Sequence, residues 1–173
     1  MIKTDQMKIK IYIADLAAYN EGKLIGEWVT LPVDDMQKVI DSILLPGHEE
    51  YTIQDYEAPF EIKEYDSPFE LNKLAKRIEE MDDHEKEDLQ YILQAVGDVK
   101  EALKILESGD YRIYDNCHSM EDVAMAIVEE LGVLDNVPEN LRYYFNYEKL
   151  GRDLEIDGNF YYVGNGIYVE IIN

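Results

Sequence analysis

The sequence predicts an α+β fold made of three small units: a ββαβ unit over residues 1–66, a helical bundle over 67–110, and an α+β unit over 111–173 that ends in a β-hairpin. Three observations predict it. Alternating, β-branched segments lie in the first and last thirds of the chain, helical periodicity fills the middle, and an Asn-Gly pair separates two apolar segments near the C-terminus. At 173 residues and 46% apolar content, the chain can form packed cores.

The first unit is predicted from strand and turn signals. Residues 7–13, 24–31 and 50–55 read as strands, because they are rich in β-branched residues. The segment between the first two strands is expected to be a loop with positive φ at Asn20, Gly22 and Gly26. Asp34 or Asp35 caps a helix that ends before Pro46 and Gly47. Its apolar positions follow helical spacing and are Met36, Val39, Ile40, Ile43 and Leu44.

The middle unit reads as helix throughout. A capping box at Ser67, with Pro68 at the first helical position, opens a helix that continues to about residue 81. Two more helices are expected over 83–96 and 98–108, each ended by a glycine. The unit has too few residues for a core of its own, so we expect it to pack on its neighbours.

The third unit begins with a strand over 111–114. Ser119 and Asp122 cap a helix that Gly132 stops. The inward face of this helix is predicted to be Val123, Ala124, Ile127, Val128 and Leu131. Two final strands, 160–163 and 167–171, are joined through Gly164, Asn165 and Gly166.

An aromatic and acidic stretch over 137–158 connects these elements. Pro138 is placed to open a short helix, and Asn146 to cap a second one. Four aromatics lie close together in this stretch: Tyr143, Tyr144, Phe145 and Tyr147. Aromatic side chains dominate both cores and interfaces, so the sequence leaves two interpretations open, a local core or a self-association surface.

The charge is the most unusual property of the chain. It has 38 acidic and 16 basic residues, a net charge of −22, which divides into −8, −6 and −8 over the three units. This excludes binding to nucleic acid through a basic patch. An evenly acidic folded surface repels itself, so we infer that a function requires it; plain solubility or a halophilic habit is the alternative.

No constellation of residues points to catalysis, a metal or a cofactor. The three histidines lie in three different units, and the Cys117–His118 pair has no second pair at zinc spacing. Asp153, Glu155 and Asp157 are spaced as in a calcium loop, but Gly164 stands where the bidentate Glu belongs. The start of the chain lacks the features of a signal peptide and no apolar run could span a bilayer. With a single cysteine, a cytoplasmic protein is expected.

Three segments resemble one known family. They are IYIADLAAYNEGKLIGEWVTLPVD at 11–34, EEYTIQDYEAPFEIKEY at 49–65, and VPENLRYYFNYEKLGRDLEIDGNF at 137–160. In order and spacing they resemble the ArdA family of antirestriction proteins, which are carried by conjugative plasmids and transposons. The resemblance covers almost the whole chain and is weakest over 67–108.

The resemblance implies a function and an assembly. The protein would be an elongated, curved homodimer of three small domains in a row, with the third at the dimer centre. It would mimic B-form DNA and occupy the groove of type I restriction–modification enzymes, contacting their DNA-specificity and methyltransferase subunits in a bacterial cytoplasm. It would bind neither nucleic acid nor membrane. Residues 137–155 lie within the region that is similar to the antirestriction motif of the family.

Candidate residues follow from the charge and the resemblance together. The dimer contact is expected at the four aromatics named above. The partner-binding carboxylates are expected at Asp15, Glu21, Glu27, Asp55, Glu57, Glu79, Glu80, Asp82, Asp83, Glu129, Glu130, Glu148, Asp153 and Glu155. Two other classes of function stay open, an acidic adaptor for another basic protein and a hydrolase using one carboxylate pair.

Overall fold

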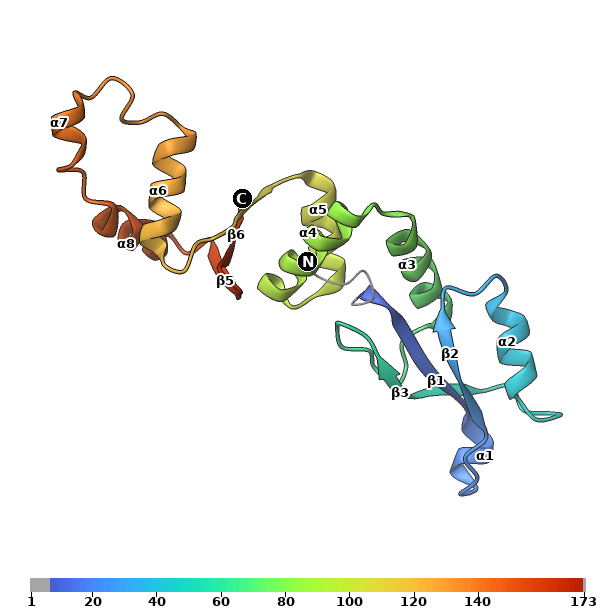
Figure 1. The fold of residues 1–173 in the computed structure, drawn as a ribbon. Coiled ribbons are helices and arrows are strands. Elements are labelled where there is room, and N and C mark those ends of the chain that lie inside the picture. Colours follow the sequence, from blue (N-terminus) through green and yellow to red (C-terminus); the bar gives the residue numbers. More distant parts are fainter. Residues whose placement is uncertain (1–6, 173) are drawn as a thin grey trace. The chain divides into compact units, whose positions relative to one another are not determined.

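The computed structural model describes residues 7–172 and separates into two compact units, Met1–Glu87 and Asp88–Asn173. The described part of the chain is mixed α+β, as predicted, with eight helices and two antiparallel three-stranded sheets (Figure 1). The three-domain arrangement is not confirmed by this division, and its boundaries at 66/67 and 110/111 remain a prediction.

The N-terminal unit is built around strand β1, Ile9–Asp15. It pairs antiparallel with β2, Gly26–Leu31, on one side and with β3, Tyr51–Glu57, on the other, which gives the order β2-β1-β3. Successive side chains alternate between the faces of a strand, so β1 buries its three isoleucines, which stand at every second position. The core of this unit includes Ile9, Ile11, Ile13, Val29, Leu31, Met36, Ile40, Ile43 and Ile53.

Helix α2, Met36–Ile43, contacts β1 and begins at Asp35, whose carboxylate accepts from the backbone N–H of Lys38. Helix α3, Pro68–Glu80, begins at Ser67 as predicted. The buried Asn72 on α3 accepts from the N–H of Val33 at 2.7 Å and donates to its carbonyl at 2.9 Å. This amide therefore anchors α3 to the segment that follows β2.

The prediction of a loop between the first two strands is wrong in part. A short helix, α1, Leu16–Asn20, begins directly after β1 with Asp15 as its N-cap. Gly22 has positive φ, as expected, but neither Asn20 nor Gly26 does. Gly26 lies in β2, and a Cβ there would come within 2.9 Å of the Ala14 Cα, so glycine is required there by close strand approach.

The C-terminal unit begins within helix α4, Asp83–Val96, and continues into α5, Val99–Ser108. Asp98 caps α5, and Gly109 ends it in the left-handed conformation. The Tyr111 hydroxyl donates to Asp88 on α4 at 2.6 Å, which connects the helical pair to the following strand. The buried apolar residues of this pair are Leu89, Ile92, Leu93, Ala102 and Leu103.

The second sheet has the order β4-β6-β5, from β4, Tyr111–Tyr114, β5, Phe160–Gly164, and β6, Ile167–Ile171. The predicted hairpin is confirmed, because Asn165 and Gly166 both have positive φ in its turn. A buried cluster of Tyr114, Cys117 and Val123 packs beside this sheet.

Helix α6, Met120–Glu130, begins with the predicted capping box of Ser119 and Asp122. Its predicted inward residue Leu131 is instead exposed, because the helix ends one residue earlier and the chain turns away at Gly132. Helix α7, Glu139–Arg142, follows Pro138, and α8, Tyr147–Asp157, is capped by Asn146. A Cβ at Gly151 would lie 2.6 Å from the Met120 carbonyl carbon, so α8 can approach the start of α6 only with glycine there.

Candidate partner-binding surface

Thirteen of the fourteen predicted carboxylates are exposed. They lie on strands β2 and β3, beside α1, on four of the helices and, for Asp82, just before α4, and both compact units carry them. By sequence the two units are equally charged: the first has 21 acidic and 10 basic residues and the second 17 and 6, so each has a net charge of −11. The negative charge therefore covers both units rather than one.

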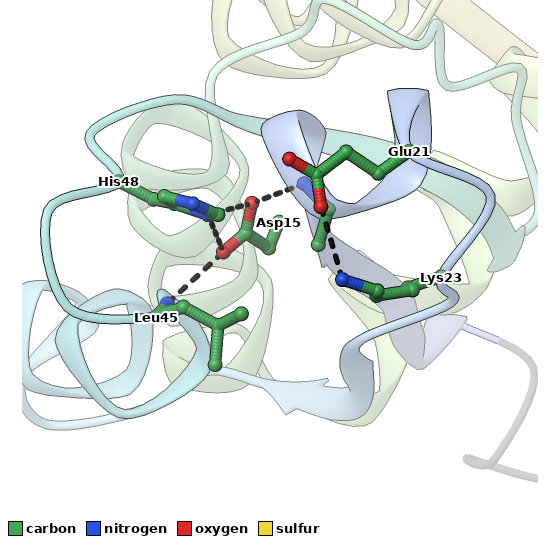
Figure 2. A network of polar contacts seen from close by, with 6 residues as sticks. Asp15, Glu21, Lys23, Leu45 and His48 are labelled. Carbon is green, nitrogen blue, oxygen red and sulfur yellow. Dashed lines mark hydrogen bonds and ion pairs between the residues drawn. The ribbon is translucent and has the colours of Figure 1, made fainter.

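The fourteenth, Asp15, is a correction to the predicted surface. Its side chain is fully buried, so it presents no charge to a partner. The carboxylate accepts from the backbone N–H groups of Ala18 at 2.9 Å and Leu45 at 3.0 Å, and it lies 2.7 Å from the ring Nδ1 of His48 (Figure 2). Asp15 therefore holds the start of α1 and the end of α2 together, which is a structural task.

The environment of Asp15 changes its acidity. Burial raises the pKa of a carboxyl group, but here the two backbone hydrogen bonds and His48 favour the ionised form more strongly. The pKa of Asp15 consequently falls from 3.8 to about 2.

Three of the exposed carboxylates are partly neutralised by a neighbouring cation. Glu21 pairs with Lys23 at 3.1 Å, Glu57 with Lys10 at 3.4 Å, and Glu148 with Arg152 at 3.4 Å. Within residues 7–172 the other ten make no ion pair. These ten unpaired carboxylates are Glu27, Asp55, Glu79, Glu80, Asp82, Asp83, Glu129, Glu130, Asp153 and Glu155.

Several unpaired carboxylates lie where they oppose helix stability. Glu79 and Glu80 end α3, Glu129 and Glu130 end α6, and the last turn of α6 has no basic residue. The carboxyl end of a helix carries partial negative charge, so anions there are unfavourable. Helix stability does not explain these side chains, whereas Asp82 accepts from the Glu85 N–H and caps α4.

The predicted dimer aromatics divide into two pairs. Tyr143 and Tyr144 are 89% and 78% exposed and contact each other edge to face at 5.8 Å. Phe145 and Tyr147 are half-buried, and their ring centres lie 4.9 Å apart. The first pair therefore belongs to the surface of the single chain and the second to its local packing.

Further exposed apolar side chains lie on helices α6, α7 and α8 and on the segment that follows α6. Arg142 fixes the loop before α7 by donating to the carbonyls of Val137 and Asp135. The exposed apolar residues of this part of the chain are Met125, Leu131, Val133, Leu141 and Ile156. Apolar exposure of this extent on one unit is typical of a surface that binds protein.

The residues considered for metal binding do not form a cluster. Among residues 7–172 there is no group of three or more potential ligands. Asp153, Glu155 and Asp157 lie on helix α8 and not in a loop. Cys117 is a buried free thiol whose pKa is raised by burial and by Asp122 and Asp115. No helix within the same range is long and apolar enough to cross a bilayer.

Comparison with known families decides the relationship. The model of the family described as antirestriction protein (ArdA) matches residues 11–169, which is nearly the whole chain. The chain belongs to the ArdA family. No curated protein matches the sequence. The antirestriction activity that the family name states is therefore the function that this membership implies.

One group of residues in this ArdA-family chain was missed by the sequence analysis. On the first sheet Lys10 Nζ lies 4.6 Å from the centre of the Trp28 ring, and Tyr12 meets Trp28 edge to face at 5.5 Å. Strand alternation places Lys10 and Tyr12 on one face. Only the pairing register, in which Tyr12 lies opposite Trp28, shows that the tryptophan joins them.

The Asp15 network leads to a prediction about pH. The ionised carboxylate stabilises the folded N-terminal unit, and its folded pKa of about 2 is below the ordinary 3.8. This stabilisation is fully present above about pH 5 and is lost as the pH falls through about 2. The unfolding free energy of Asp15→Asn should therefore lie below that of the unchanged protein at neutral pH, and the difference should shrink as acid is added.

Urea unfolding followed by the fluorescence of Trp28, the only tryptophan, measures this difference between pH 2 and pH 7. The exposed Asp34→Asn is the control and should leave unfolding nearly unchanged at every pH. A difference for Asp15→Asn that is the same at both ends of this range would contradict the role assigned to the carboxylate.

Proposed function

We propose that this ArdA-family chain inhibits type I restriction–modification enzymes by mimicking B-form DNA in their DNA-binding groove. The observation that carries the proposal is the set of ten exposed, unpaired carboxylates, distributed over both units. Their side chains take the place of phosphates and meet the Lys and Arg side chains that a DNA groove presents. The inhibitor acts in the bacterial cytoplasm by binding alone, with no catalytic step and no cofactor.

The positions of these carboxylates favour mimicry over plain solubility. Solubility needs net charge anywhere on the surface, and charge at helix N-termini would also stabilise the fold. The two adjacent glutamates at the end of α3 and the two at the end of α6 instead add charge at a cost in stability. This placement is expected when the positions of the charges matter to a partner.

Self-association is the second part of the proposal. Tyr143 and Tyr144 contact each other and are exposed, and Leu141, two residues before Tyr143, is exposed as well, so this segment forms an apolar surface on the C-terminal unit. We assign the homodimer contact to this surface, because Tyr is enriched in interface cores and these rings have no cover in the single chain. A homodimer doubles the net charge to −44, twice the −22 of one chain.

The function is tested by titrating the protein into a purified type I restriction–modification enzyme bound to labelled DNA. DNA and inhibitor should exclude each other, so the labelled DNA should be released stoichiometrically, and less effectively at higher salt. Anisotropy of the DNA label measures the release. A stable ternary complex of enzyme, DNA and inhibitor would favour an acidic adaptor and defeat the proposal.

A charge-neutralising series tests whether the surface acts as a whole. The triple variant Glu79→Gln, Glu129→Gln and Asp153→Asn removes three unpaired charges, each contributing on the order of 1 kcal/mol or less. Single variants should therefore inhibit nearly as well as the unchanged protein, and the triple should be weaker by their summed effect, because distant sites add. Dissociation constants at two salt concentrations give the measurement.

The matched control neutralises three carboxylates that already have a cation, Glu21, Glu70 and Glu148, each to Gln. It changes the net charge equally and should weaken inhibition less. Complete loss of inhibition from one substitution in a folded protein would instead identify a catalytic residue, since members of a catalytic set are not additive.

The dimer contact is tested by Tyr143→Ala with Tyr144→Ala. Both rings are exposed in the single chain, so this change should yield a folded monomer with an unchanged circular dichroism spectrum. Light scattering gives the mass. The control, Tyr65→Ala, removes an equally exposed ring from the N-terminal unit and should leave the dimer intact. A double variant that is still a dimer would move the contact elsewhere.

A further inference from the structure

One face of the N-terminal sheet carries an exposed aromatic and charged cluster that the acidic surface alone does not explain. The pairing register sets two rows across the three strands. One row is Trp28, Tyr12 and Asp55, and the next is Thr30, Lys10 and Glu57. Trp28 is 40% exposed even though it is the largest apolar side chain of the sheet.

This cluster already holds a cation. The Lys10 ammonium lies 4.6 Å from the centre of the Trp28 ring and 3.4 Å from Glu57 Oε1. Tyr12 supports the indole from the side by its edge-to-face contact. An aromatic face with a carboxylate beside it is a recognised arrangement for binding a positively charged group.

The Lys10 ammonium is a weaker partner for the Trp28 ring and for Glu57 than an arginine guanidinium would be. An ammonium is strongly hydrated, and an exposed ion pair such as Lys10–Glu57 is weak. A guanidinium is planar, stacks on an indole and binds carboxylates through two parallel hydrogen bonds. Asp55, opposite Tyr12, is exposed and makes no ion pair within the described residues, so a second carboxylate is available on this face.

We propose that this sheet face is a docking site for an arginine side chain of the partner protein, which displaces Lys10 from the Trp28 ring and binds Glu57 and Asp55. The inference rests on the proposed function, because a DNA groove presents such arginines. It adds a specific contact to the distributed charge: Trp and Arg are enriched among the few residues that dominate interface energies.

Charge complementarity selects a basic protein over other occupants. Nucleic acid and anionic membrane surfaces are repelled by a chain of net charge −22. A second copy of this sheet face carries the same two carboxylates, Asp55 and Glu57, and is disfavoured as the occupant for that reason.

The first test compares three aromatic variants in the DNA-displacement titration. Trp28→Ala should raise the dissociation constant for the restriction–modification enzyme at least tenfold, and Trp28→Phe should raise it less, because a smaller ring remains. The control, Tyr65→Ala, should change it less than twofold. A folded Trp28→Ala variant, by circular dichroism, with unchanged affinity overturns the inference.

A second pair of variants keeps the test decisive if Trp28→Ala fails to fold. Lys10→Met removes the internal cation and keeps an apolar stem, so it should tighten binding. Lys38→Met removes an equal charge from the Lys38–Asp35 pair on α2 and corrects for the gain in net negative charge. Lys10→Met should tighten binding at least threefold more than Lys38→Met, and equal effects would overturn the inference.

A third measurement separates this inference from the proposed function. Octa-arginine and octa-lysine contain no tryptophan, so the fluorescence of the single Trp28 reports their binding directly. Octa-arginine should bind at least threefold more tightly at equal salt. Trp28→Ala, followed by calorimetry, should lose this preference, and Trp28→Phe should keep part of it. Equal binding of both peptides overturns the docking site. Failure of the unchanged protein to displace DNA overturns only the proposed function.

Discussion

Electrostatic self-repulsion is the constraint on which the rest of this structure depends. Each compact unit carries a net charge of −11 and must remain folded against it. Exposed ion pairs offset little of this repulsion, so the stability comes from small apolar cores, such as the β-branched residues of β1 packed with α2. The cores are mostly apolar, and two of the polar side chains inside them have several partners: Asn72 binds both backbone groups of Val33, and Asp15 accepts from two N–H groups.

The acidic residues consequently fall into two groups with different physical tasks. One group stabilises the fold by capping helices, since the carboxylates of Asp35, Asp98 and Asp122 each accept from a backbone N–H at a helix start. The other group, including Glu129 and Glu130, lies at helix ends where a cation would serve stability better. The carboxylates of Glu129 and Glu130 therefore have no part in helix capping.

Local signals made most of the fold predictable, and long-range contacts account for what was not. The caps at Ser67, Ser119 and Asn146 and the hairpin turn at Asn165 depend on neighbours within a few residues, and all were predicted. Asp15 was assigned to the surface because its partners Leu45 and His48 lie about thirty residues away in the sequence. The sequence could not show which aromatics of the stretch are exposed and which are half-buried. Tyr143 and Tyr147 differ in exposure only because the fold gives them different neighbours. The helix α1 had a usable signal, an aspartate before Leu-Ala-Ala, but Asn20 and Gly22 favoured a loop.

The strand order β2-β1-β3 has a consequence for aggregation. A three-stranded sheet ends in two edge strands, whose free backbone groups invite pairing with another chain. Here the edge strands carry Glu27 on β2 and Asp55 and Glu57 on β3, all exposed. Charged side chains on an edge discourage a second acidic strand from docking, which keeps such sheets from extending into fibrils. The negative charge on these edge strands thus also protects the sheet, and an ArdA-family chain that lost it there would be exposed to misassembly.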